Sequence, residues 1–203
     1  MYTLLCLRCQ RNYWSFITCE GVMPRPPDPL LEGRILEAAR KLFMKGGEKT
    51  LSMRALARLA HTNTPAVYRR FRNRKAILRA LMGRYQQDLY QALQPCTSPQ
   101  EACERILEFA LARPREYRLA FSEWFSKFQK PRPNFEYLKT RFAEWLGGSP
   151  EDHSSLALGL WAQIHGTAML LISKAVPLED QAELRSVFSA SVKLLVSNAS
   201  AHR

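Results

Sequence analysis

The stretch from Leu51 to Leu78 restricts the possible folds of this chain most, because it encodes two short helices separated by a turn. Ser52 can accept a hydrogen bond at the start of the first helix. The apolar residues of that helix recur at the spacing of a single helix face and are Met53, Leu56, Ala57 and Ala60. The pattern lapses at His61, and Asn63 then offers a second N-cap with Pro65 in the first turn. The stretch therefore predicts two consecutive helices.

The second helix has an apolar face and a free face. Val67 and Phe71 stand one turn apart and can anchor it. The free face is small at its start and cationic at its end, and consists of Thr64, Pro65, Ala66, Tyr68, Arg69 and Arg70. Two helices joined by a short turn, the second with such a face, are typical of a helix-turn-helix and its recognition helix.

Positive charge is concentrated on the same part of the chain. The formal net charge is +12. Residues 1–22 contribute +1, residues 23–83 contribute +10 and residues 84–203 contribute +1. A basic region confined to the predicted helix-turn-helix favours a polyanionic partner over a charged face that serves only solubility.

The segment from Ile35 to Leu81 resembles the DNA-binding domain of the TetR family of bacterial transcriptional regulators. The resemblance rests on ILEAARKLF, on the Leu56-Ala57 pair, on TPAVYRRF and on the NRKAIL that opens the next helix. His61 and Pro65 stand where the family usually has glycine, and Arg74-Lys75 replaces a Lys followed by an acid. The last departure adds positive charge where a phosphate would lie.

Two sets of DNA contacts are expected. The resemblance implies phosphate contacts, and their residues are Ser52, Thr64, Tyr68, Arg70 and Arg74. The free face of the recognition helix predicts the residues nearest the base edges, which are Thr64, Pro65, Ala66 and Arg69. The expected partner is a double-stranded, palindromic operator, and the expected role is that of a repressor, although the sequence leaves activation open.

The first 22 residues differ from the rest of the chain and hold three of the five cysteines, Cys6, Cys9 and Cys19. We interpret them as an over-extended start that precedes a true start at Met23, because Met23 opens a Pro-rich lead-in to the first helix. A disordered tail or an added helix is one alternative. A metal or redox site is another, but a closed structural zinc site needs four ligands and neither a second CxxC nor a nearby His is present.

The remaining helical signals predict an all-α fold. After a first helix at about 30–45, the expected helices cover residues 73–94, 98–112, 114–128, 135–146, 150–175 and 179–197. Asn73 and Ser98 are the expected N-caps of the helices at 73–94 and 98–112, and Glu101 is expected to complete a capping box with Ser98. The expected inner face of the helix at 73–94 consists of Ile77, Leu78, Leu81, Tyr85, Leu89 and Leu93. The predicted organisation is an N-terminal extension at 1–28, a three-helix DNA-binding domain at 29–83 and a helical domain at 84–203 for ligand binding and dimerisation. The helix at 73–94 is long enough, at about 30 Å, to be shared by both domains.

Two pieces of the C-terminal part, ARPREYRLAF and LWAQIHGTAML, resemble a C-terminal domain found in one branch of the same family. This resemblance implies dimerisation and a small-molecule effector. We expect helices 150–175 and 179–197 to pair across a two-fold axis as a four-helix bundle in a homodimer. The expected pocket for a hydrophobic or aromatic effector is lined by Tyr117, Phe121, Trp124, Phe125, Trp161, Gln163, His165 and Met169. The alternative is a solid aromatic core in which His165 is hydrogen-bonded.

Other functional classes have little support. The sequence has no HExxH, GxSxG, P-loop or dinucleotide-binding pattern, so we expect no enzyme and no cofactor. The four His are scattered, so no metal site is expected. No signal peptide or membrane-spanning stretch is evident, and Cys96 and Cys103 are expected to be reduced in a cytoplasmic protein. The competing hypothesis is a basic helical module that binds a membrane surface or a protein.

Overall fold

Helices make up every regular element in the part of the chain that the computed structural model describes, residues 28–122 and 133–201. Three short 3-10 turns accompany them: η1 (Gly47–Thr50), η2 (Pro150–His153) and η3 (Leu178–Asp180). The α-helices are α1 (Leu31–Gly46), α2 (Met53–Leu59), α3 (Thr64–Arg70), α4 (Arg74–Leu93), α5 (Pro99–Ala112), α6 (Pro114–Ala120), α8 (Pro133–Leu146), α9 (Ser154–Ser173) and α10 (Gln181–Ala201). The predicted all-α class is confirmed.

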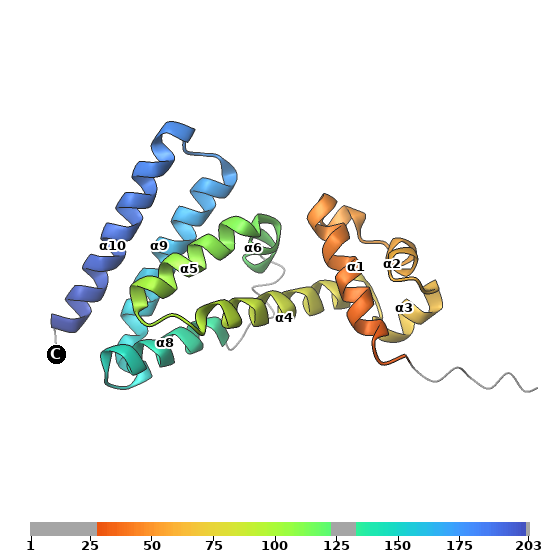
Figure 1. Cartoon of the computed structure of the whole chain (residues 1–203), viewed down its shortest axis with the longest axis horizontal. Helices are drawn as coiled ribbons and strands as arrows, with labels where there is room; N and C mark the ends of the chain where they lie inside the picture. The colour runs from red at the N-terminus through yellow and green to blue at the C-terminus, as the bar shows by residue number, and fades with distance from the viewer. Residues whose placement is uncertain (1–27, 123–132, 202–203) are drawn as a thin grey trace, which may run out of the picture.

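The helices form two groups that α4 connects (Figure 1). Helices α1, α2 and α3 pack together at one end, while α5, α8, α9 and α10 lie at the other. Helices α9 and α10 run side by side at the end farthest from α3, and α6 lies between the two groups. The chain thus has a three-helix N-terminal unit and a larger helical C-terminal unit, as the sequence predicts.

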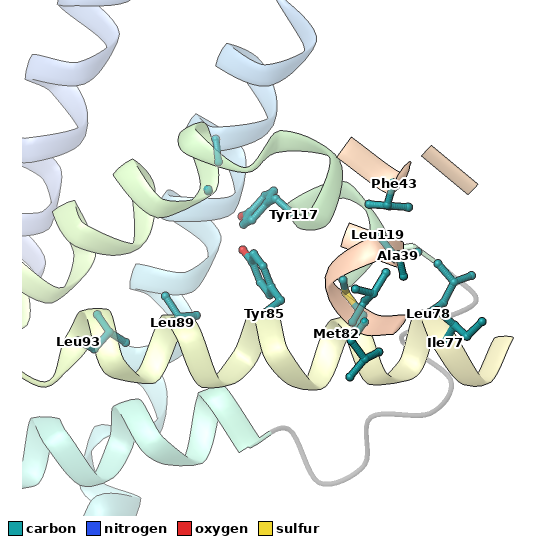
Figure 2. Close-up of a cluster of buried hydrophobic side chains, with 14 of the residues drawn as sticks. Ala39, Phe43, Ile77, Leu78, Met82, Tyr85, Leu89, Leu93, Tyr117 and Leu119 are labelled. Carbon is teal, nitrogen blue, oxygen red and sulfur yellow. The ribbon is translucent and has the colours of Figure 1, made fainter. Parts of the chain in front are cut away.

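Helix α4 contributes to both groups along its length. Its expected inner face is buried throughout, and Met82 joins it with no exposed surface. Figure 2 shows that Ile77, Leu78 and Met82 meet α1, whereas Leu89 and Leu93 continue toward the C-terminal helices. Because the buried positions recur every three to four residues over 20 residues, one helix contributes to the core in both groups of helices.

Side chains predicted to cap helices do so. The amide of Ala55 donates to Ser52 at 3.1 Å, and that of Ala66 donates to Asn63 at 2.8 Å. Asn73 caps α4 and Ser98 caps α5 in the same way. Glu101 was expected to complete a capping box by accepting from the amide of Ser98. Its carboxylate instead accepts from the amide of the preceding residue, Thr97, at 2.9 Å.

The turn between α2 and α3 places a non-glycine residue in the left-handed region. His61 has φ = 52°. Glycine adopts this conformation without a steric cost, which explains why the family usually has glycine at this position. The amide of the next residue, Thr62, donates to the carbonyl of Ala57 at 2.9 Å and fixes the direction of the chain.

Replacing this residue is expected to stabilise the fold slightly. His61→Gly removes the steric cost of the left-handed conformation but makes the unfolded chain more flexible. The net expected change is a gain of about 0.5 kcal/mol in the free energy of unfolding. Chemical denaturation measures it, with His61→Ala as the control that is expected to lose stability. A lower free energy of unfolding in His61→Gly would show that the left-handed conformation of His61 is not strained.

The helix expected from residue 114 to 128 ends earlier. Helix α6 stops at Ala120, because Ser122 turns back and its hydroxyl donates to the carbonyl of Leu119 at 2.8 Å. The two expected effector-binding residues beyond this turn, Trp124 and Phe125, lie outside the described residues, as do Met23, Cys6, Cys9 and Cys19.

One described segment, Pro150–Ser173, is long and apolar enough to cross a membrane by length and composition, although no such stretch was evident from the sequence. The segment has 24 residues and comprises η2 and α9. A single segment of this kind is weak evidence for a membrane protein, and α9 packs against α5, α8 and α10 as a core helix does. Only 33% of its apolar window is buried within the chain, so much apolar surface is left uncovered.

Candidate DNA interface and regulatory site

The recognition helix α3 is held by its apolar side. Val67 has no exposed surface, and Phe71, which is the C-cap of α3, is 6% exposed. These two residues join Leu56 of α2 in the core of the N-terminal unit. The opposite side of α3 is therefore left facing solvent.

The outer face of α3 carries most of the residues expected there. Tyr68 is 54% exposed, Pro65, Arg69 and Arg70 are exposed, and Thr64 is half-buried. Ala66 is the exception, because its side chain is only 4% exposed and faces the core beside Val67. Its expected place on the outer face was wrong, since two adjacent positions of this short helix are used for packing on α2.

Two of the arginines expected to meet phosphates are already positioned by backbone contacts. Arg70 donates to the carbonyl of Asp28 at 3.2 Å, and Arg74 donates to the carbonyl of Glu48 at 3.3 Å. Ser52, which is exposed, accepts from the amide of Ala55 in the first turn of α2. These contacts keep the two guanidinium groups close to the ends of α3 and α4 while both side chains stay exposed.

Arg34 of α1 supports this region and was not identified from the sequence. Its Nε donates to the carbonyl of Ala60 at 3.3 Å, and its Nη2 lies 2.8 Å from the carboxylate of Asp28. It therefore joins the turn of the helix-turn-helix to the residue that Arg70 also contacts. The separation of 26 residues between Arg34 and Ala60 leaves no local pattern from which this contact could be predicted.

A larger set of exposed cations lies on α3 and on the elements next to it in the chain. Its members are exposed residues of α2, of α3, of the turn between α3 and α4 and of the first turn of α4, namely Arg54, Arg58, Arg69, Arg70, Arg72, Arg74 and Lys75. A group of this kind around a protruding helix suits the phosphates on both sides of a major groove.

The second candidate site is an aromatic cluster formed by α6, its C-cap residue and α9. We define the aromatic cluster as Tyr117, Phe121, Trp161 and His165. The rings of Phe121 and His165 have centroids 4.3 Å apart, and those of Tyr117 and Phe121 are 4.7 Å apart. Trp161 stacks on Phe121 with a centroid separation of 6.1 Å. The structure thus brings together four residues that were expected to line an effector site.

A neutral hydrogen bond orients the aromatic cluster. The hydroxyl of Tyr117 and Nδ1 of His165 are 3.1 Å apart, so Nδ1 accepts from Tyr117 in the tautomer that carries its proton on Nε2. Burial lowers the pKa of His165 and raises the pKa of Tyr117. Both groups are therefore uncharged near neutral pH, which suits contact with an uncharged or weakly polar molecule.

The remaining expected effector residues are placed differently. Met169 is half-buried, two turns along α9 from Trp161, and packs against the core. Gln163 lies two positions from both Trp161 and His165, so it points about 160° away from them and is exposed. Its expected place beside the cluster was wrong, because helical spacing puts residues three or four apart, not two, on the same face.

Two further aromatic residues, Tyr85 and Phe109, continue the buried aromatic region and were not expected at an effector site. Tyr85 of α4 has its ring centroid 5.2 Å from that of Phe109, and Figure 2 shows Tyr85 and Tyr117 turned toward each other. Burial raises the pKa of Tyr85. Tyr85 was recognised from the sequence only as an apolar position, because its hydroxyl leaves no mark on helical periodicity.

The described residues contain no group of three or more His, Cys, Asp or Glu that could hold a metal ion. Cys96 and Cys103 are free and buried, and burial raises the pKa of the Cys103 thiol to about 12. A thiol with so high a pKa is a poor nucleophile and metal ligand near neutral pH.

Two family models match the chain. The model of bacterial regulatory proteins of the tetR family matches residues 35–81. The model described as "Tetracyclin repressor-like, C-terminal domain" matches residues 100–195. Together they cover more than half of the chain and correspond to the two groups of helices. No curated protein matches the sequence. The matches indicate no catalytic family.

Several solved structures share the fold. TetR from Acinetobacter baumannii AYE is 18% identical, with a TM-score of 0.61 over 82% of this chain and 95% of that one, and a variant of it was solved in complex with minocycline. BioQ from Mycobacterium smegmatis is 20% identical, with a TM-score of 0.59 over 85% and 98% of the two chains. The multidrug binding protein EbrR, solved with imidazole, is 19% identical, with a TM-score of 0.57 over 87% and 95%.

The family models thus cover the capped pair α2 and α3 as well as the helices that carry the aromatic cluster. The chain belongs to the TetR family of transcriptional regulators, and α2 and α3 are its DNA-binding helix-turn-helix.

Proposed function

We propose that this protein is a cytoplasmic repressor that binds a palindromic operator as a homodimer and is released by a small hydrophobic or aromatic molecule. The observation that carries the proposal is the outer face of α3, where Tyr68 and Arg69 protrude among exposed cations. The reading domain comprises residues 29–83, and the effector and dimerisation domain comprises residues 84–203.

Contacts to DNA divide into two kinds in this proposal. Tyr68, Arg70 and Arg74 bind phosphates together with Ser52 and Thr64, which sets affinity and register. Pro65 and Arg69 reach the base edges with Thr64, and Arg69 has the length and donors to read guanine in the major groove. Because Ala66 is buried, Thr64 and Pro65 are the small residues at the start of α3 that remain to contact base edges.

The dimer is proposed from apolar surface that the single chain leaves uncovered. On α9, Leu158 is 53% and Leu170 is 41% exposed, and a side chain added at Gly166 between them would meet nothing within 4 Å. On α10, Val187 is 54% and Leu194 is 63% exposed, two turns apart. Since α9 and α10 pack side by side, these residues suit a four-helix bundle with a second copy of the chain.

A two-fold axis between the chains would set two α3 helices against successive major grooves of a palindromic site. The effector would bind at the aromatic cluster, whose groups are rings and uncharged polar atoms. Release of DNA requires that the effector prefer an arrangement of α4 and α6 in which the two α3 helices no longer fit.

The first test is direct binding of DNA. Fragments of the source genome that the full chain retains are sequenced, and a shared palindrome is the expected result. Retention of anionic vesicles without any sequence-selective DNA binding would instead favour the basic module that binds a membrane surface.

The contact assignment is tested on the duplex so recovered. Arg70→Ala is expected to weaken binding to every sequence by about tenfold and to lower the slope of log affinity against log salt by roughly one, because one phosphate cation is lost. Tyr68→Phe is expected to weaken binding without changing the slope. Arg115→Ala, at an exposed arginine of α6, is the control and leaves both unchanged. Unchanged affinity in both variants, with the fold intact, removes the assignment.

A further inference from the structure

An ionic cluster joins the reading domain to the regulatory domain. Arg40 of α1 lies with Nη1 3.8 Å from Oδ2 of Asp88 on α4, and with Nε 3.6 Å from Oε1 of Glu116 on α6. Arg113, between α5 and α6, approaches the same Asp88 oxygen at 2.9 Å. One guanidinium of the reading domain is thus shared by carboxylates from two later elements.

Glu116 depends on these cations because it has little access to water. Its side chain is 5% exposed, and its Oε2 has no hydrogen-bond partner among the described residues. Burial raises the pKa of Glu116, Arg40 and Arg113 oppose the rise, and Asp88 adds to it. A carboxylate that is so buried is strongly attracted to the nearest guanidinium, since little water competes for it.

Helix α6 presents different faces to the two sites. Glu116 and Leu119 lie one turn apart toward α1, where Figure 2 shows Leu119 beside Ala39. Tyr117 and Phe121 also lie one turn apart, and they contact His165 of α9. Among the described elements beyond α4, α6 is the one that packs substantially on α1. Because α6 has only seven residues, a movement of Tyr117 displaces Glu116 with it.

We propose that Arg40 is a positioning residue that holds the orientation of the reading domain through Asp88 and Glu116. Arg40 acts here without touching DNA. The effect on DNA affinity rests on the function proposed above, whereas the contact between α1 and α6 is a property of the free protein.

The contact is tested by amide hydrogen exchange on the full-length chain without DNA. Arg40→Gln and Glu116→Gln are each expected to speed exchange in α1 and α6 by about fivefold or more, while α9 and α10 keep wild-type rates. Arg115→Gln is the matched control: Arg115 is exposed on α6 and has no partner among the described residues. Arg115→Gln removes one positive charge, as Arg40→Gln does.

Global stability separates positioning from a merely structural role. The pKa of Glu116 is higher in the folded chain than in the unfolded chain. Its contribution to the free energy of unfolding is therefore fully present below the unfolded-state pKa and is lost as the pH rises through the folded-state pKa. At neutral pH the ionised carboxylate therefore disfavours folding, and glutamine avoids that cost. Glu116→Gln is expected to leave the free energy of unfolding unchanged or higher while exchange in α1 increases. Wild-type exchange rates in both variants would overturn the proposal.

The second readout is affinity for a duplex selected by the wild-type chain. Arg40→Gln removes a cation and Glu116→Gln removes an anion, so a general charge effect would weaken DNA binding in the first and tighten it in the second. The proposal expects both to weaken binding by about fivefold, because the freed reading domains must be ordered again on DNA.

Salt dependence and the double variant complete the test. The salt slope is expected to stay at the wild-type value, and the double variant is expected to bind no worse than the weaker single variant, since both break one contact. Opposite effects of the two substitutions would refute the positioning role. If the wild-type chain retains no duplex, the proposed function fails, and hydrogen exchange alone decides the contact between α1 and α6.

Discussion

Replacing Val187 and Leu194 together by glutamate is expected to convert the protein from a dimer to a monomer. The two residues are 54% and 63% exposed in the single chain and share a face of α10. In the proposed bundle, the change buries four unpaired carboxylates across the two-fold axis, at a cost of at least about 4 kcal/mol. The dimer dissociation constant then rises by roughly a thousandfold.

Light scattering at micromolar concentration measures this change, and a gel-shift assay follows its effect on DNA. Affinity for a palindromic duplex is expected to fall by about a hundredfold or more, because the two half-sites are no longer bound by linked domains. Leu178→Glu, at an apolar residue in η3 that is 84% exposed, is the control and is expected to stay dimeric. A double variant that remains a dimer would show that another surface pairs the chains.

The second large effect is expected at the aromatic cluster. Trp161→Ala and His165→Ala remove, respectively, the ring that stacks on Phe121 and the hydrogen-bond partner of Tyr117. Both variants are expected to bind DNA as the wild type does but to lose release by the effector. An effector that shifts the equilibrium by about 3 kcal/mol weakens DNA binding by roughly two orders of magnitude, and this whole response disappears.

The effector is sought by a thermal-shift screen of aromatic and hydrophobic compounds, and release is followed by fluorescence anisotropy of labelled DNA. Trp145→Ala is the matched control, because Trp145 is also half-buried and carries Arg141 over its ring at 4.5 Å, yet it lies on α8. It is expected to lose stability and keep the response. A cluster that is plain core would instead give loss of stability at Trp161 and no compound that binds.

Local signals account for most of the fold that was predicted correctly. Ser52, Asn63, Asn73 and Ser98 cap the helices that begin after them, because a short polar side chain before an apolar repeat has few other favourable roles. The end of α6 was missed, since aromatic residues continue at helical spacing beyond Ser122, whose hydroxyl donates to the carbonyl of Leu119.

The candidate sites were predictable only where one helix carried them. The exposed positions of α3 followed from the anchors Val67 and Phe71, although the burial of Ala66 depends on how closely α2 approaches. Contacts between distant residues, such as Arg34 with Ala60 or Arg40 with Glu116, leave no trace in periodicity. Such pairs depend on tertiary packing, which a single sequence does not encode locally.

The sharing of α4 has a consequence for how this chain can unfold and evolve. Ile77 and Met82 pack in the N-terminal unit, while Leu89 and Leu93 extend toward the C-terminal unit, so a break after residue 83 would leave each unit with its own residues but with only part of the helix. Neither half could then keep the whole helix that supports it, and loss of either core would fray α4 for its neighbour. The two units are therefore expected to melt in a single cooperative transition. Recombination between relatives would be tolerated at the ends of α4 rather than within it.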